Sequence, residues 1–249
     1  MTDLHELAGR VAIVTGAGRN IGRAIALSLA AGGADVVVNA RSNVQEAEAV
    51  VREIEDAGGQ AIAVIGDVVD PVAVATMVAA AVKRFGRIDY LINNAALRGE
   101  KAIEHMTFED WRKVIGVTLD GAFHCVKACL EAIKKSDAGS IINVGGLTGA
   151  MGAPDRLHVV TAKAGIAGFT RGLAMELALH KVTVNTLVPA MLAKPDKPHE
   201  IPAHPIYRPL LGRAAWPTDI APLARFLVGP GARYLTGQLI NVNGGTYFG

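Results

Sequence analysis

The sequence predicts an α/β fold in which seven parallel strands form one doubly wound sheet covered by helices on both faces. Seven short runs rich in β-branched residues alternate with longer segments of helical period. The cores of these runs are apolar throughout, as expected of strands that are buried on both sides. Because strand and helix alternate along the chain, we expect right-handed crossovers and a parallel sheet.

Each predicted element is supported by its own local signals. Ser42 with Gln45 resembles a capping box, Asp70 precedes a proline at a first helical position, and Thr107 with Asp110 again suits a helix start. The predicted strands occupy residues 10–16, 34–40, 61–67, 88–94, 139–146, 181–189 and 237–245.

Composition favours one compact domain spanning residues 1–249. Of the 249 residues, 51% are hydrophobic and 19% are charged, which leaves little room for long disordered tails. The 25 basic and 23 acidic residues give a formal charge of +2, so neither nucleic acid nor an anionic membrane surface is expected as a partner. No apolar run approaches the roughly 18 residues of a membrane-spanning helix.

The cysteines and the N-terminus predict the compartment. Cys125 and Cys129 are too few for a disulfide framework, and neither has zinc-ligand spacing, so no metal site is expected. The first ten residues lack the basic start and apolar stretch of a signal peptide. We therefore expect a cytoplasmic protein with buried thiols.

One stretch, residues 190–217, breaks the alternation. It contains six prolines and shows no regular period. It follows the sixth predicted strand, at the carboxyl end of the sheet, where open α/β sheets bind their ligands. We expect a loop that covers a substrate.

The first predicted strand ends in a glycine-rich turn that leads into an apolar helix. Glycine lets the backbone approach a pyrophosphate closely, and the helix N-terminus offers free N–H groups to its charge. A glycine turn alone is a weak signal, because tight turns also occur without ligands. The expected cofactor contacts in the turn are Gly16, Gly18, Arg19, Asn20, Ile21 and Gly22.

The turn resembles the TGxxxGxG motif of the short-chain dehydrogenase/reductase family, with Asn20 in place of the middle glycine. Asparagine tolerates left-handed backbone better than most residues, so the turn can form. Further landmarks of the family follow at the proper intervals, and the resemblance spans essentially the whole chain. They include Asp67 and Val68 after the third strand, Asn93, Asn94 and Ala95 after the fourth, Lys163 in a later helix, Pro189 after the sixth strand, and residues 242–245.

The chain is thus identified as a divergent member of that family, similar to the 3-oxoacyl-carrier-protein reductases. The resemblance implies a Rossmann fold holding a nicotinamide dinucleotide. It assigns Asp67 and Val68 to the adenine, Lys163 to the ribose and Pro189 to the nicotinamide. It also implies a homotetramer in which helices near residues 107–135 and 157–179 pair between subunits.

The residue at the end of the second strand distinguishes NAD from NADP, because an acidic residue there would bind the 2′-hydroxyl of NAD. Here that position is Ala40, followed by Arg41, and Arg19 supplies a second cation. Two guanidinium groups favour a 2′-phosphate. We expect NADP(H) to be preferred, with NAD(H) possible, although both arginines could instead be solvated surface charges.

Three catalytic positions depart from the family. By the resemblance, the catalytic asparagine falls at Thr118, the serine at Gly146 and the tyrosine at Val159, and only Lys163 is kept. The family's tyrosine acts as the general acid and its serine orients the carbonyl. Valine and glycine can do neither, so reduction of an ordinary ketone by the usual mechanism should be very slow.

His158 is the nearest substitute acid, because histidine has a pKa suited to proton transfer. It would lie about 100° around the helix from Val159 and Lys163 if the helix has begun there. We therefore weigh it as a candidate catalytic residue against a buried or interface histidine.

Three functions remain open. The leading hypothesis is an NADP(H)-dependent oxidoreductase with altered catalytic residues, acting on a small carbonyl, imine or quinone-like substrate that needs little proton assistance. The alternatives are a non-catalytic dinucleotide-binding sensor or oligomer partner, and a non-redox enzyme on the same scaffold.

Overall fold

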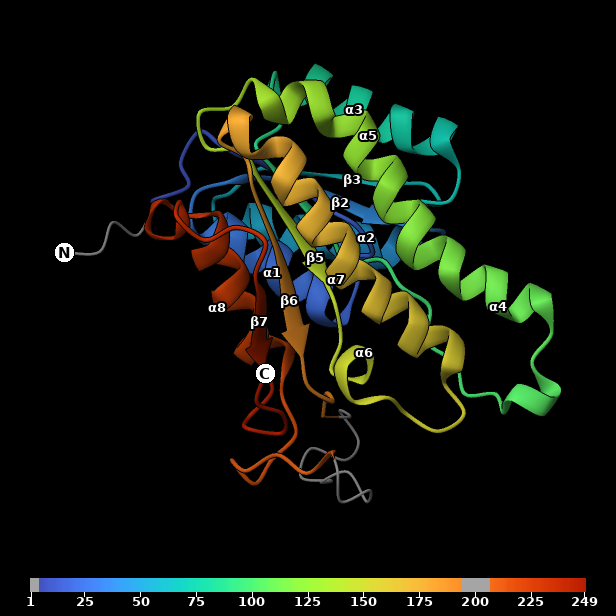
Figure 1. The fold of residues 1–249 in the computed structure, drawn as a ribbon. Helices are drawn as coiled ribbons and strands as arrows, with labels where there is room; N and C mark the ends of the chain where they lie inside the picture. The colour runs from blue at the N-terminus through green and yellow to red at the C-terminus, as the bar shows by residue number, and fades with distance from the viewer. Residues whose placement is uncertain (1–4, 194–206) are drawn as a thin grey trace.

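The computed structural model describes residues 5–193 and 207–249, and it confirms the predicted sheet (Figure 1). Seven strands pair in the order β3-β2-β1-β4-β5-β6-β7, and every pairing is parallel. This is a Rossmann-like, doubly wound arrangement. The strands are β1 (Val11–Val14), β2 (Asp35–Ala40), β3 (Ala61–Ile65), β4 (Tyr90–Asn93), β5 (Ser140–Val144), β6 (Thr183–Pro189) and β7 (Leu239–Val242).

Helices cover both faces of the sheet, with α1, α2 and α8 on one side and α3, α5 and α7 on the other (Figure 1). A π-helical turn at Gly116–Asp120 joins α4 to α5, so the predicted long helix of residues 107–135 is nearly continuous. Short 3₁₀ turns lie at Ile103–His105, Ala178–His180 and Pro230–Ala232. The helices are α1 (Asn20–Ala31), α2 (Val44–Asp56), α3 (Pro71–Phe85), α4 (Phe108–Ile115), α5 (Gly121–Lys134), α6 (Thr148–Met151), α7 (Leu157–Leu177) and α8 (Pro217–Val228).

Two of the three predicted helix starts are confirmed. Asp70 caps α3 by accepting a hydrogen bond from Val72 N, and Thr107 forms a capping box with Asp110. The predicted cap at Ser42 is wrong. The helix begins one residue later, at Val44, so the side chain of Asn43 reaches the third helical N–H instead.

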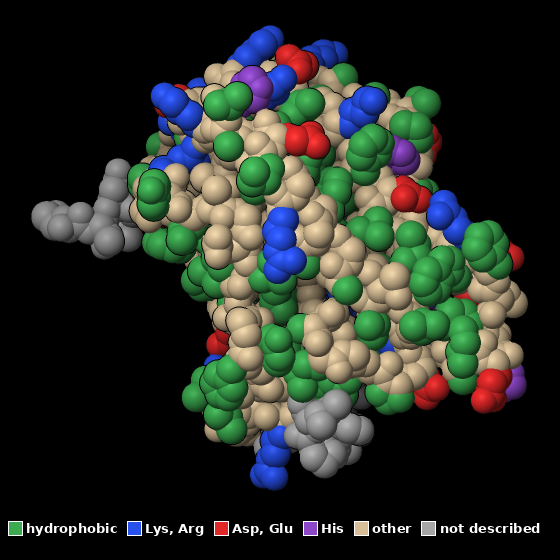
Figure 2. Space-filling model, viewed as in Figure 1, with side chains coloured by type: hydrophobic (Ala, Val, Ile, Leu, Met, Phe, Trp, Pro, Cys, Tyr) green, Lys and Arg blue, Asp and Glu red, His purple; other side chains and the backbone are tan. Residues whose placement is uncertain are grey.

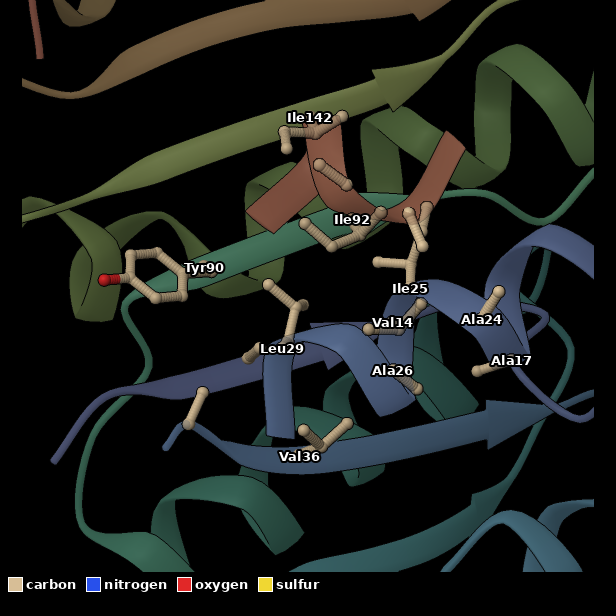
Figure 3. Close-up of a cluster of buried hydrophobic side chains, with 14 of the residues drawn as sticks. Val14, Ala17, Ala24, Ile25, Ala26, Leu29, Val36, Tyr90, Ile92 and Ile142 are labelled. Atoms are coloured by element: carbon tan, nitrogen blue, oxygen red, sulfur yellow. The ribbon is translucent and has the colours of Figure 1, made fainter. Parts of the chain in front are cut away.

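The strands are apolar throughout because both of their faces are buried. Along β1, Val14 packs with Val36 and Ile92 on the α1 side, whereas the adjacent Ile13 faces the opposite cluster. Figure 3 shows the first cluster, in which Ile25 and Leu29 of α1 lie against the sheet. The sheet is therefore held between two apolar layers, and its strand ends are fixed in place.

The two described ends of the predicted loop at residues 190–217 are tied together. Ala193 N donates to Ala215 O at 2.8 Å, and Ala215 N donates to Met191 O at 3.0 Å. The buried Tyr207 donates its hydroxyl to Gly152 O, just before α7. The middle of the loop, residues 194–206, lies outside the described residues. Within the ranges 5–193 and 207–249, no helix is long and apolar enough to cross a membrane.

Candidate functional site

The turn between β1 and α1 has backbone geometry that few residues tolerate. Gly16 has a φ of +61°, and Asn20 has a φ of 50°, as expected of an asparagine in a glycine position. A Cβ at Gly22 would lie 2.4 Å from Gly16 O and 2.5 Å from Asn94 Nδ2. The turn therefore packs so closely that position 22 admits only glycine.

Polar side chains from neighbouring strands hold this turn. Asn94 donates from Nδ2 to Thr15 O at 2.8 Å and to Gly16 O at 3.0 Å, and Thr15 Oγ1 accepts from Asn94 N. Asn39 Oδ1 accepts from Gly16 N, and its Nδ2 donates to Val64 O and Gly66 O. These bonds connect β1 to β4 on one side and to β2 and β3 on the other.

A cleft of about 590 Å³ opens along the carboxyl ends of these strands. It brings together most of the residues predicted from the sequence to bind the cofactor: Gly16, Gly18, Arg19, Asn20, Ile21, Gly22, Arg41, Asp67, Val68, Asn94 and Ala95. It also contains residues that were not predicted as cofactor contacts: Asn39, Ala40, Ser42, Asn43, Glu46, Gly66, Ala96, Leu97, Arg98 and Val117.

Two arginines line the β2 end of the cleft. Arg19 is the residue before α1, and Arg41 follows Ala40, the last residue of β2. Neither guanidinium forms an ion pair with any residue that the structure describes. Glu46 also lines this end, and a Cβ on Gly18 would lie 3.1 Å from its Cβ. Arg19 and Arg41 thus have no ion-pair partner among the described residues, and the carboxylates of Glu46 and Asp67 also line the cleft.

Three predicted cofactor contacts, Asn93, Lys163 and Pro189, lie outside the cleft lining. Asn93 is buried in the sheet, where its Nδ2 donates to Asn143 Oδ1 at 2.8 Å. Asn143 in turn donates to Thr170 Oγ1, so the side chain of Asn93 belongs to a polar network behind the site. Pro189 is the buried last residue of β6, and its carbonyl accepts from Leu147 N.

Lys163 of α7 lies over Gly146, just beyond β5. Its Nζ donates to Val144 O at 2.8 Å, and a Cβ at Gly146 would lie 3.4 Å from Lys163 Cγ. A side chain at position 146 would therefore be in van der Waals contact with the lysine stem. Burial, followed by the nearby charge of Arg98, lowers the pKa of the Lys163 ammonium from 10.5 to about 7.

The other two positions assigned to catalytic groups hold no acid. Val159 is 6% exposed and packs in an apolar cluster with Trp111 and Leu97. Thr118 lies in the π-helical turn, and its buried Oγ1 has no partner among the described residues. The side chains packed around position 159 are thus apolar.

His158 is only 3% exposed and does not line the cleft. It is the second residue of α7, so the helix has begun there, and its Nδ1 has no hydrogen-bond partner in the described part of the chain. The ring lies beside Gly99, because a Cβ at Gly99 would be 3.4 Å from His158 Nε2. The structure thus places His158 behind the segment that follows β4.

Arg98 is the cationic residue of the cleft that sequence reasoning missed. It lies four residues after Asn94 and lines the cleft with Leu97. Solvent reaches the side chain, but protein surrounds it closely enough that burial, followed by the charge of Arg156, lowers its pKa. No motif marks this position, and only the fold brings it near Lys163.

The comparisons with known proteins agree with this fold. A sequence model described as short chain dehydrogenase matches residues 10–202. The chain is 42% identical over 244 residues to a 3-oxoacyl-[acyl-carrier-protein] reductase of Synechocystis sp., covering 97% of this chain and 98% of the relative.

Solved structures are similar over nearly the whole chain. A dehydrogenase/reductase from Sinorhizobium meliloti superposes with a TM-score of 0.92 at 32% identity, covering 98% of this chain and 97% of the other. A blue fluorescent protein from a metagenomic library, in complex with NADPH, gives 0.90 at 31% identity, covering 97% and 99%. The expectation of an NADP(H) cofactor agrees with that complex.

Proposed function

Because this chain belongs to the short-chain dehydrogenase family, we propose that it is an NADP(H)-dependent oxidoreductase whose catalytic groups are altered. The observation that carries the proposal is the cleft itself. A glycine turn, a helix N-terminus and two unpaired arginines line one continuous cavity. The substrate is a small carbonyl, imine or quinone-like compound.

The described residues fit a phosphorylated dinucleotide. The glycine turn lines the cleft at the start of α1, where free backbone N–H groups can bind a pyrophosphate. Arg19 and Arg41 can donate charge-assisted hydrogen bonds to a 2′-phosphate. When bound, the cofactor supplies a hydride.

The residues around the reacting end favour a substrate that needs little proton assistance. Val159 is buried among apolar side chains and offers no acid. Lys163 is the titratable group beside Gly146, and with a pKa of about 7 it can hold or release a proton near neutral pH. Such a site can position an acceptor whose reduced form is already stable, such as an iminium or a quinone.

One observation favours a second candidate, a dinucleotide-binding protein without turnover. Thr118 leaves a buried hydroxyl unpartnered in the described structure, and Val159 sits in a closed apolar cluster. Neither group resembles a replacement catalytic acid.

Oxidation of NADPH by a panel of carbonyls, imines and quinones supports the first candidate, whereas binding of NADPH without any oxidation supports the second.

The cofactor preference is tested by titrating NADPH and NADH against the wild type and Arg41→Ala. We expect wild type to prefer NADPH, and the variant to lose about 1.5–3 kcal/mol of NADPH binding, which is about 10- to 160-fold. Arg52→Ala is the matched control, because Arg52 lies on α2 outside the cleft and contacts Glu48. Equal affinities for the two cofactors, unchanged by Arg41→Ala, would refute the preference.

We further propose that the protein is a homotetramer that pairs α4, α5 and α7 between subunits. Large apolar side chains are exposed on these elements, including Phe108 (76%), Phe123 (50%) and Met175 (82%). Figure 2 shows hydrophobic side chains gathered over α4. Burying such a surface in an interface with twofold symmetry would stabilise the assembly.

A further inference from the structure

Arg98 lies at the end of the cleft opposite to Arg41. β2, which carries Arg41, pairs with β1 on one side, whereas β4, which precedes Arg98, pairs with β1 on the other. Lys163, whose charge interacts with that of Arg98, lies beyond β5, one strand further along. If the 2′-phosphate binds at Arg41, Arg98 therefore stands at the reacting end.

The segment that carries Arg98 is anchored to the start of α7 by three contacts. Lys101 N donates to Asp155 O at 2.6 Å, and Glu100 forms an ion pair with Arg156. The third contact is the packing of Gly99 against the buried ring of His158. These contacts anchor the backbone that follows Arg98, and His158 is one of the groups that the segment packs against.

The charges at this end of the cleft are not balanced. Arg156 is neutralised by Glu100. Arg98 has no hydrogen bond or ion pair to any described residue, and Lys163 binds only the carbonyl of Val144. Two like charges near each other repel, and each disfavours the charged form of the other. An anion bound at Arg98, which lines the cleft, would interact favourably with its guanidinium and with the nearby charge of Lys163.

Apolar side chains form part of the wall beside Arg98. Leu97 and Val117 line the cleft with it, and Leu97 packs against Val159. Such a wall favours a small ligand with a short hydrocarbon body.

We propose that Arg98, acting with Lys163, binds a carboxylate carried by the substrate. Arginine suits this role, because its planar guanidinium can bond both oxygens of a carboxylate. The substrate class is then a small oxo acid, or its imine, and not a neutral ketone. This inference rests on the proposed function, since it takes the neighbouring space as the place of reduction.

The test measures binding without turnover. Pyruvate and 3-oxobutanoate, each beside its methyl ester, are titrated by calorimetry into the protein loaded with NADP⁺ and into the cofactor-free protein. We expect each acid to bind at least about tenfold more tightly than its ester to the wild type. Arg98→Gln should remove that preference while its affinity for NADP⁺ stays within about twofold. Arg98→Lys should keep part of the preference for the acid, because the positive charge is kept and the two-pronged guanidinium is lost.

Arg112→Gln is the control, because it removes an exposed arginine of α4 that pairs with Asp120 away from the cleft. It should leave the preference for the acid intact, and thermal melts check that each variant is folded. Equal binding of acid and ester to the wild type would overturn the inference. So would an Arg98→Gln variant that loses NADP⁺ as strongly as the acid, since Arg98 would then be a cofactor contact. Failure of the wild type to bind NADP⁺ would count against the proposed function alone, and the cofactor-free titration would still decide the role of Arg98.

Discussion

Replacing Lys163 with methionine should flatten the dependence of stability on pH. The lysine has a pKa of about 7 in the folded protein, mainly because it is buried, against 10.5 as the ordinary value. Between these values the unfolded chain binds more protons than the folded one, so the free energy of unfolding rises with pH. The destabilisation caused by Lys163 is fully present below pH 7 and is relieved as the pH rises towards 10.5.

The two pKa values set the size of the effect. Integrating the difference in bound protons from pH 7 to pH 9 gives a gain of about 2 kcal/mol in the wild type. Lys163→Met lacks this gain, although it also loses the bond to Val144 O, which shifts its curve without changing the slope. Urea denaturation of the cofactor-free protein, at one protein concentration and several pH values, measures both curves.

The exposed Lys113→Met is the control for removing a lysine. It should leave the slope of the wild type unchanged. Parallel curves for the wild type and Lys163→Met between pH 7 and pH 9 would refute the argument, because they would mean that the Lys163 amine is not perturbed by its surroundings.

Three further predictions concern the turn, the missing groups and the assembly. Gly22→Ala should cost at least about 1–3 kcal/mol of stability and most NADPH binding, because its Cβ would lie 2.4 Å from Gly16 O. Gly168→Ala is the control, because no atom lies within 4 Å of the added Cβ, and it should keep NADPH binding. A comparable loss of NADPH binding in both variants would contradict the prediction. The double variant Gly146→Ser/Val159→Tyr should reduce activated ketones with NADPH about 10²-fold faster than wild type in single-turnover assays. A folded, NADPH-bound variant that is no faster would show that the pocket is not the family's active site with its catalytic groups removed. Sedimentation at micromolar concentration should give a mass well above the 25.9 kDa of one chain, and a clean monomer would contradict the assembly.

The sequence predicts the sheet well because burial on both faces leaves a strong local signal. Each strand core is continuously apolar, and the parallel order follows from the alternation with helices. The left-handed backbone of Asn20 was also predictable, since it stands where the family has glycine. The cap at Asn43 was missed because Ser42 is an equally good capping residue. The exact turn after β2 decides which of the two residues caps the helix.

The parts of the site that depend on distant residues could not be predicted. Asn39 joins β1 to β3 through side-chain hydrogen bonds, and no local pattern marks it. Arg98 becomes a candidate site residue only because the fold brings it near Lys163, 65 positions later in the chain. The sequence likewise could not show that Lys163 lies across Gly146, which depends on the packing of α7 against β5.

If this cleft holds NADPH and passes its hydride to a substrate despite the altered catalytic groups, the hydride can be followed as deuterium. The wild type is incubated with NADPH deuterated at the transferable C4 position and with a panel of oxo acids, imines and quinones. Mass spectrometry then follows the deuterium. We predict that deuterium appears in the reduced product of at least one acceptor, and that Arg41→Ala slows its transfer at limiting NADPH. Tight binding of NADPH with no deuterium transferred to any acceptor would contradict the claim and leave a dinucleotide-binding protein without turnover.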